Sequence, residues 1–126
     1  PFDQAYLKHF YEVNQFHGKF LDLGCGPGQT TKFLYDCGCR NLTGIDLSSG
    51  MIEIAQKEFP QIEFLVGDIL SLPYDDCGIG SIIAFYSIVN FTLEQVEKAF
   101  QEIYRVLKAN GQFFFSFHIP PQAQEQ

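Results

Sequence analysis

The sequence predicts a single α/β domain over residues 1–126, built around a mostly parallel sheet. Short apolar runs alternate along the chain with segments whose apolar residues recur at helical spacing. The runs are apolar on both faces, which is typical of strands that helices cover from two sides. Apolar residues make up 46% of the chain and 14 residues are Phe, so the domain can bury a core and a disordered class is excluded.

Five apolar runs are the predicted strands. The first, Phe20-Leu21-Asp22-Leu23, ends in glycines, which is the pattern of a buried strand. The other four predicted strands cover residues 42–46, 62–66, 81–86 and 112–118.

Helical patterns fill the gaps between these runs. Residues 2–16 predict an N-terminal helix with Tyr6, Phe10 and Val13 facing inward. Two shorter helices are predicted over residues 28–37 and 49–59. The stretch after Pro73 is polar and rich in glycine, so the connection between the third and fourth strands is expected to be irregular.

The clearest helix lies between the fourth and fifth strands. Apolar residues recur there at steps of 3, 4, 3 and 4 through residues 93–107, which places them on one helical face. Thr92 and Gln95 have the spacing of a capping box at its start. Asn110 and Gly111 predict its end.

Charge and hydropathy exclude two classes of partner. The formal net charge is -7, from 8 basic and 15 acidic residues, so the chain repels phosphate backbones and no nucleic-acid partner is expected. No apolar stretch approaches the roughly 20 residues of a membrane span, so no membrane partner is expected either.

The four cysteines do not have the spacing of a metal site. Their pattern, C-x11-C-x-C-x37-C, lacks the paired C-x2-C of zinc knuckles, and the three His residues are scattered, so no metal is predicted. Free thiols in a reducing compartment are the simplest interpretation, which predicts a cytoplasmic protein. The pair Cys37 and Cys39 leaves a minor redox role open.

A glycine-rich turn follows the first strand, in the stretch Gly24-Cys25-Gly26-Pro27-Gly28. Alternate glycines let the backbone turn tightly and let a ligand approach without a Cβ in the way. A dinucleotide-binding loop would have its third glycine at position 29, where this chain has Gln29. Pro27 also lacks an amide that a pyrophosphate would use. The loop therefore fits a close-packed ligand that depends less on anion binding.

An acidic residue ends the second strand. Asp46 follows Gly26 by 20 residues, and a carboxylate at that position can accept hydrogen bonds from two vicinal ribose hydroxyls. Alone it would be explained equally well as a charge at a helix N-terminus. Together with the loop, it predicts a nucleoside-containing ligand.

These motifs resemble those of the class I S-adenosyl-L-methionine-dependent methyltransferases. The loop from Asp22 to Gly28 is similar to the signature loop of that family, and three further stretches are similar in the same order: residues 44–51, 67–73 and 107–111. The resemblance covers residues 18–118. It implies a Rossmann-like three-layer α/β/α sandwich, with five strands present of the family's seven.

The resemblance also implies which residues bind the cofactor. They are Asp22, Gly24, Cys25, Gly26, Gly28, Asp46, Leu47, Met51, Asp68, Ile69 and Tyr86. In the family, the loop and its preceding acid hold the methionine part, and the second acid binds the ribose. The apolar pair Leu47 and Met51 would enclose the adenine. Asp68 and the amide of Ile69 would meet its polar edge, and Tyr86 would face the sulfonium.

The implied activity is methyl transfer to a small-molecule acceptor by in-line displacement. Such a reaction depends mainly on alignment, and a general base is needed only where the acceptor arrives protonated. His118, Tyr86 and Asn90 are the candidate catalytic residues, at the carboxyl ends of the fourth and fifth strands. The chain departs from the family at Asn90, where a His is common, and at Cys77-Gly78, where Phe-Asp is common.

Two other functions stay open at this point. The chain could be a cofactor-binding module without turnover of its own, since it ends where the family completes its acceptor pocket. A nicotinamide-dependent oxidoreductase is the weaker alternative, disfavoured by Pro27 and Gln29.

We expect the domain to be truncated after its fifth strand. An apolar strand such as 112–118 at a sheet edge invites pairing with another chain. We therefore expect either self-association through that edge or further residues in the gene product.

Overall fold

A computed structural model describes residues 4–85 and 91–116. Its elements, in chain order, are α1 (Gln4–Asn14), β1 (Phe20–Leu23), α2 (Gln29–Asp36), β2 (Leu42–Asp46), α3 (Ser49–Glu58), β3 (Glu63–Val66), β4 (Ile79–Phe85), α4 (Leu93–Val106) and β5 (Leu107–Ser116). Strands and helices alternate as the sequence predicted, and the connection between β3 and β4 is irregular.

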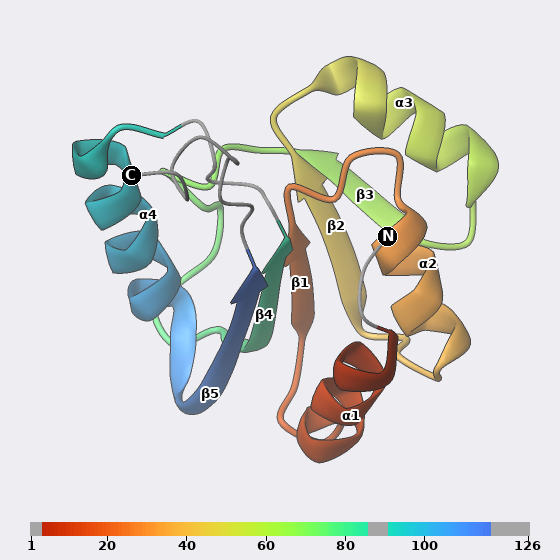
Figure 1. Cartoon of the computed structure of the whole chain (residues 1–126), viewed down its shortest axis with the longest axis horizontal. Coiled ribbons are helices and arrows are strands. Elements are labelled where there is room, and N and C mark those ends of the chain that lie inside the picture. The colour runs from red at the N-terminus through yellow and green to blue at the C-terminus, as the bar shows by residue number, and fades with distance from the viewer. Residues whose placement is uncertain (1–3, 86–90, 117–126) are drawn as a thin grey trace, which may run out of the picture.

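The five strands form one sheet in the order β3-β2-β1-β4-β5, and all four strand pairings are parallel (Figure 1). The predicted α/β class is confirmed. The chain moves outward in one direction from β1 to β3 and then crosses to β4 on the other side of β1. The strand order therefore reverses between β1 and β4, and ligands of such sheets bind beyond the carboxyl ends of the strands at that point.

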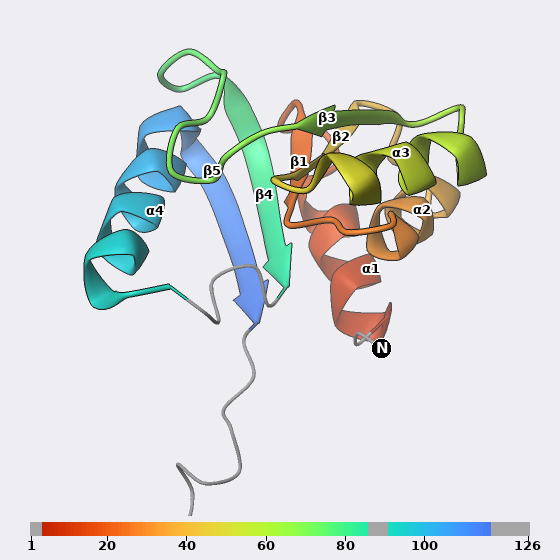
Figure 2. The same ribbon diagram turned by 90° about the horizontal axis from the view of Figure 1, so that it is seen from above.

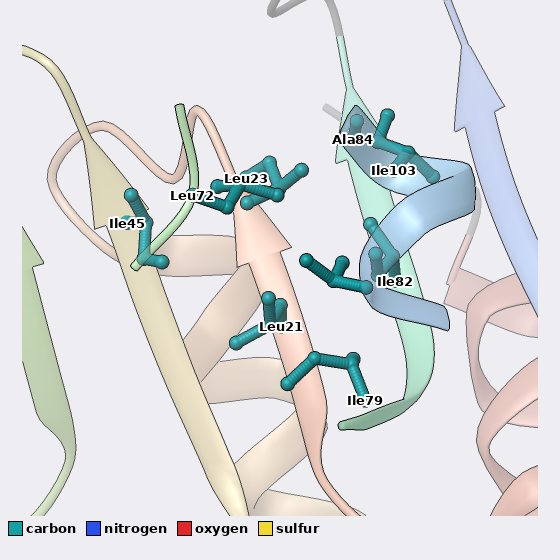
Figure 3. Packing of buried hydrophobic residues seen from close by; sticks show 9 residues of the cluster. Leu21, Leu23, Ile45, Leu72, Ile79, Ile82, Ala84 and Ile103 are labelled. Carbon is teal, nitrogen blue, oxygen red and sulfur yellow. The ribbon is translucent and has the colours of Figure 1, made fainter. Parts of the chain in front are cut away.

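Helices cover both faces of the sheet, with α1, α2 and α3 on one side and α4 on the other (Figure 2). On the α4 side, nine buried apolar residues form one cluster, of which Leu21, Ile82 and Ile103 are examples (Figure 3). On the opposite face, Leu7 and Leu34 of the helices pack with buried residues of the strands. Two-sided burial explains why β1 and β4 are largely apolar along their whole length.

The end of α4 differs from the prediction. The helix ends at Val106, four residues before the predicted stop at Asn110, and β5 begins at once with Leu107. Leu107 pairs with Ile79, whereas the next paired residues are Ser81 and Gln112, so residues 108–111 form a bulge in β5. Pairing with β4 thus overrides the local stop signal.

The buried face of α1 also differs from the prediction. Leu7 and Asn14 are fully buried and Phe10 is partly buried, whereas Tyr6 is 67% exposed and Val13 is 53% exposed. The prediction was therefore wrong for Tyr6 and Val13. The Asn14 amide donates to the Phe10 carbonyl oxygen at 2.8 Å and to a side-chain oxygen on β5, and these bonds permit its burial.

Cysteine and acidic side chains form no covalent link and no metal-type cluster within the described residues. All four cysteines are free thiols. Across residues 4–85 and 91–116, no three His, Cys, Asp or Glu side chains gather in a way that could hold a metal ion. Within the same ranges, none of the helices has the length and hydropathy to cross a membrane.

Candidate cofactor site

The glycine loop between β1 and α2 runs across the carboxyl end of the sheet. Gly24, Gly26 and Gly28 all have positive φ, at 66°, 55° and 94°. A Cβ on Gly28 would lie 2.8 Å from Cζ of Phe64, so this glycine is required by packing as well as by backbone conformation. A Cβ on Gly26 would meet no atom within 4 Å, so that side of the loop is open to a ligand.

Strand β2 holds the loop in place through backbone groups and one side chain. The Cys25 amide donates to the Ile45 carbonyl oxygen at 3.0 Å, and the Gly26 amide donates to Asp46 Oδ1 at 3.1 Å. Asp46 Oδ2 accepts from the Ser48 amide at 3.0 Å, just before α3. The Asp46 carboxylate therefore fixes the loop and the start of α3 together, and each oxygen keeps lone pairs for a further donor.

Asp22 lies beneath the loop with 2% of its surface exposed. Thr31 on α2 donates its hydroxyl to Asp22 Oδ2 at 2.7 Å. Burial raises the pKa of Asp22 to about 7, and the charge of Asp46 adds to that rise while the Thr31 hydrogen bond opposes it. Burial also raises the pKa of the Cys25 thiol, which therefore stays protonated and unreactive.

Two cavities lie on either side of the loop. The first, of about 620 Å³, is lined by Gln4, Asp22, Gly24, Cys25, Gln29, Thr30, Lys32, Phe33, Asp36 and Phe85. The second, of about 320 Å³, is lined by Leu23, Gly24, Ile45, Asp46, Leu47, Gly67, Asp68, Ile69, Phe85 and Phe91. Gly24 and Phe85 line both cavities, so the two are adjacent parts of one site.

Most of the residues that the sequence placed at the cofactor come together here. The first cavity is lined by Asp22, Gly24 and Cys25 of this set, and the second by Gly24, Asp46, Leu47, Asp68 and Ile69. Three of the predicted residues that the structure describes, Gly26, Gly28 and Met51, line neither cavity. Gly28 packs against Phe64, and Met51 lies on α3 with 41% of its surface exposed and its amide bonded to Ser48. The roles of individual residues stay predictions.

The three candidate catalytic residues, Tyr86, Asn90 and His118, lie outside the described residues. Sequence reasoning missed Phe85, the last residue of β4, which lines both cavities. Strand alternation could have found it. Asp22 pairs with Ile83, and Phe85 is two residues further on, so it points to the same face as Asp22.

Thr31 was also missed. Its hydroxyl is buried against Asp22, and only the fold brings the first turn of α2 back over β1.

Comparison with known proteins identifies the family of the chain. Residues 20–111 match the family described as "Methyltransferase domain". An uncharacterized methyltransferase of Oceanobacillus iheyensis is 35% identical over 103 residues, which are 82% of this chain and 48% of that protein. The demethylmenaquinone methyltransferase of Chlorobaculum tepidum is 36% identical over 93 residues, which are 74% of this chain and 38% of that protein.

The fold is similar to that of solved structures as well. The crystal structure of the PH0226 protein from Pyrococcus horikoshii matches with a TM-score of 0.77 at 33% identity, over 85% of this chain and 52% of that one. The chain therefore belongs to the methyltransferase domain family, of the class that depends on S-adenosyl-L-methionine. It spans about half the length, or less, of the curated relatives named above.

Proposed function

We propose that the chain binds S-adenosyl-L-methionine across the two cavities and transfers its methyl group to a small-molecule acceptor. The observation that carries this proposal is the Asp46 carboxylate, which ends β2, lines the second cavity and is tied to the glycine loop at 3.1 Å. A carboxylate fixed in this way is suited to accept from the two hydroxyls of a ribose. The open side of Gly26 is consistent with a ligand lying against the backbone.

The two cavities would divide the cofactor between them. Its methionine part fits the first, where Asp22 could pair with the ammonium group, and its adenosine fits the second, beside Asp46, Asp68 and Ile69. Phe85 lines both cavities and would lie near the sulfonium, where the face of an aromatic ring favours a cation.

The chain's own contribution to the reaction would be alignment. When bound, the cofactor supplies a methyl group on a positively charged sulfur, which needs no further activation. The walls of the first cavity would hold the acceptor in line with that group and exclude water. A base is required only for an acceptor that arrives protonated, and His118, Tyr86 and Asn90 stay the predicted candidates.

The proposed acceptor is a small organic molecule. The first cavity combines the rings of Phe33 and Phe85 with the polar groups of Gln4 and Lys32, and the chain has a net charge of -7. Such a lining suits a partly apolar molecule with a few polar groups. The name of the Chlorobaculum relative, a demethylmenaquinone methyltransferase, describes an acceptor of this kind for that protein.

Calorimetry tests the cofactor assignment. Wild-type protein should bind S-adenosylhomocysteine and give no heat of binding with NAD. Asp46→Ala should lower the affinity for S-adenosylhomocysteine by at least about 10-fold because two hydrogen bonds to the ribose are lost. Glu53→Ala, which removes an exposed acid on α3 that lines neither cavity, is the matched control. Absence of binding by the wild type would refute the proposal.

A methyl-transfer assay with a panel of small acceptors tests turnover. Transfer to any of them would establish the enzyme. A chain that binds the cofactor but transfers nothing across a broad panel would instead be the cofactor-binding module that the sequence left open.

A further inference from the structure

The connection between β3 and β4 carries two residues of the proposed adenosine site. This β3–β4 loop, residues 67–78, forms neither helix nor strand, apart from an isolated bridge between Asp68 and Ser71. Asp68 and Ile69 near its start line the second cavity. The geometry of that cavity therefore depends on what holds this loop.

Helix α4 holds the loop through two side chains and one carbonyl group. The Leu72 amide donates to Glu102 Oε1 at 2.7 Å, and Arg105 Nη2 donates to the Leu72 carbonyl oxygen at 3.0 Å. Arg105 Nη1 donates to the Tyr74 carbonyl oxygen at 2.8 Å. The Cys77 amide donates to the carbonyl oxygen of Arg105 at 2.9 Å. The backbone of the loop is thus bound to one turn of α4 at Leu72, Tyr74 and Cys77.

Glu102 and Arg105 also bind each other. Arg105 donates from Nη2 to Glu102 Oε1 at 2.7 Å and from Nε to Oε2 at 2.8 Å, and it reaches Asp76 at 2.9 Å. The two side chains are only 16% and 34% exposed. A planar guanidinium can serve this many acceptors at once, whereas a lysine ammonium on a flexible stem cannot hold the same fork.

Leu72, which Glu102 and Arg105 both bind, is connected to the second cavity in two ways. Leu72 is 4% exposed and packs in the same cluster as Leu23 and Ile45, whose strands end at the second cavity (Figure 3). One residue earlier, the Ser71 amide donates to the Asp68 carbonyl oxygen at 2.9 Å. A fixed Leu72 therefore fixes the turn that carries Asp68.

We infer that Glu102 and Arg105 are positioning residues for the cofactor, which hold the β3–β4 loop so that Asp68 and Ile69 meet the adenosine. The inference rests on the proposed function. Neither side chain lines the two cavities, so both act through the loop. Without them the loop would have to be ordered on binding, and that ordering would reduce affinity.

The first test compares two arginine variants by calorimetry with S-adenosylhomocysteine and with adenosine. Arg105→Ala should weaken both ligands by a similar factor, at least about fivefold, since only the adenosine part is affected. Arg40→Ala is the matched control. Arg40 also donates to a backbone carbonyl, that of Tyr35, and stacks over its ring at 3.9 Å, but it precedes β2 at the opposite end of the sheet. It should change affinity less than twofold.

The second test asks whether the effect passes through Asp68. If it does, Arg105→Ala should add little to the loss already caused by Asp68→Ala, because the turn has then lost its function; additive losses would overturn the inference. If Arg105→Ala does not fold, Glu102→Gln takes its place in the test. The amide oxygen of the new side chain can still accept from the Leu72 amide, while the ion pair with Arg105 is lost. Affinity within twofold of wild type in the folded variant would overturn the positioning role alone. A wild type that binds neither ligand would overturn the proposed function as well.

Discussion

Different interactions hold the two halves of the site, which are the glycine loop and the β3–β4 loop. The glycine loop is tied to β2 by one backbone hydrogen bond and by one bond to the Asp46 carboxylate, and it packs against Phe64, which is 3% exposed. The β3–β4 loop is held mainly by an ion pair on α4 whose members are 16% and 34% exposed. The first half should therefore respond to changes of volume and to the charge of the buried Asp22 carboxyl, and the second to loss of a partly exposed ion pair.

The two halves should also differ in how much a substitution lowers the free energy of unfolding. A close-packed backbone cannot move to accept an added atom, so a small change there is expensive. A partly exposed ion pair contributes little to the free energy of unfolding, even where it sets the position of a loop. Substitutions in the glycine loop should thus lower mainly the free energy of unfolding, whereas substitutions in the ion pair should lower mainly the affinity for the cofactor.

The largest expected effect is that of Gly28→Ala on stability. The added Cβ would lie 2.8 Å from Phe64 Cζ and 3.2 Å from Ala55 Cβ, at a φ of +94°, so we expect a loss of about 2–4 kcal/mol in the free energy of unfolding. Gly26→Ala is the control. It has φ +55° and open space, so it should cost only about 1–2 kcal/mol from backbone strain. Urea denaturation measures both, and equal losses would contradict the role given to Phe64.

The elements that sequence predicted best are those decided by neighbours along the chain. Residues 20–23 and 42–46 are strands with the predicted bounds. The capping box is present in full, with the Thr92 amide donating to the Gln95 side chain at 2.9 Å and the Gln95 amide donating to the Thr92 hydroxyl at 3.2 Å. The capping groups lie within three residues of each other, so the local pattern contains the whole cause, and the strands are recognised from the apolar run itself although their partners are distant.

The elements that sequence predicted poorly depend on distant contacts. Asn14 is buried because Gln112, 98 residues later, accepts from its amide at 2.9 Å, and this turns α1 away from the face that apolar spacing favoured. Helix α4 ends early because Leu107 pairs with Ile79.

The site residues also fall into those that local sequence identifies and those that only the fold brings together. Asp22 and Asp46 stand in motifs that sequence alone can identify. The partners of Arg105 at Leu72, Tyr74 and Asp76 are 29 to 33 residues away, and no local pattern joins them.

An effect of similar size is that of Asp22→Asn on the pH dependence of stability. Because the pKa of Asp22 rises from 3.8 to about 7 on folding, its favourable contribution is complete below pH 4 and is lost as pH rises through 7. Asp22→Asn removes that dependence. At pH 8 the variant should be more stable than wild type by about 2–4 kcal/mol, since each pKa unit corresponds to about 1.4 kcal/mol.

Thermal or urea unfolding between pH 4 and 8 measures this effect. Asp36→Asn is the control, because Asp36 forms an exposed ion pair with Lys32 and should show no comparable gain. Parallel stability curves for Asp22→Asn and wild type would contradict the raised pKa of the buried Asp22 carboxyl beneath the loop.

The smallest effect belongs to the other half of the site and has the opposite sign. The hydrogen bond from Arg105 lowers the pKa of Glu102, so its contribution is present above the ordinary value of 4.5 and is lost as pH falls through the lowered one. Glu102→Gln should therefore cost about 0.5–1 kcal/mol at pH 7 and converge with wild type in acid. Salt at about 0.5 M should reduce the cost, whereas it should leave the Gly28→Ala loss unchanged. Glu97→Gln, on the exposed face of the same helix, is the control, and a Glu102→Gln cost that persisted in acid would mean that shape, and not charge, holds the β3–β4 loop.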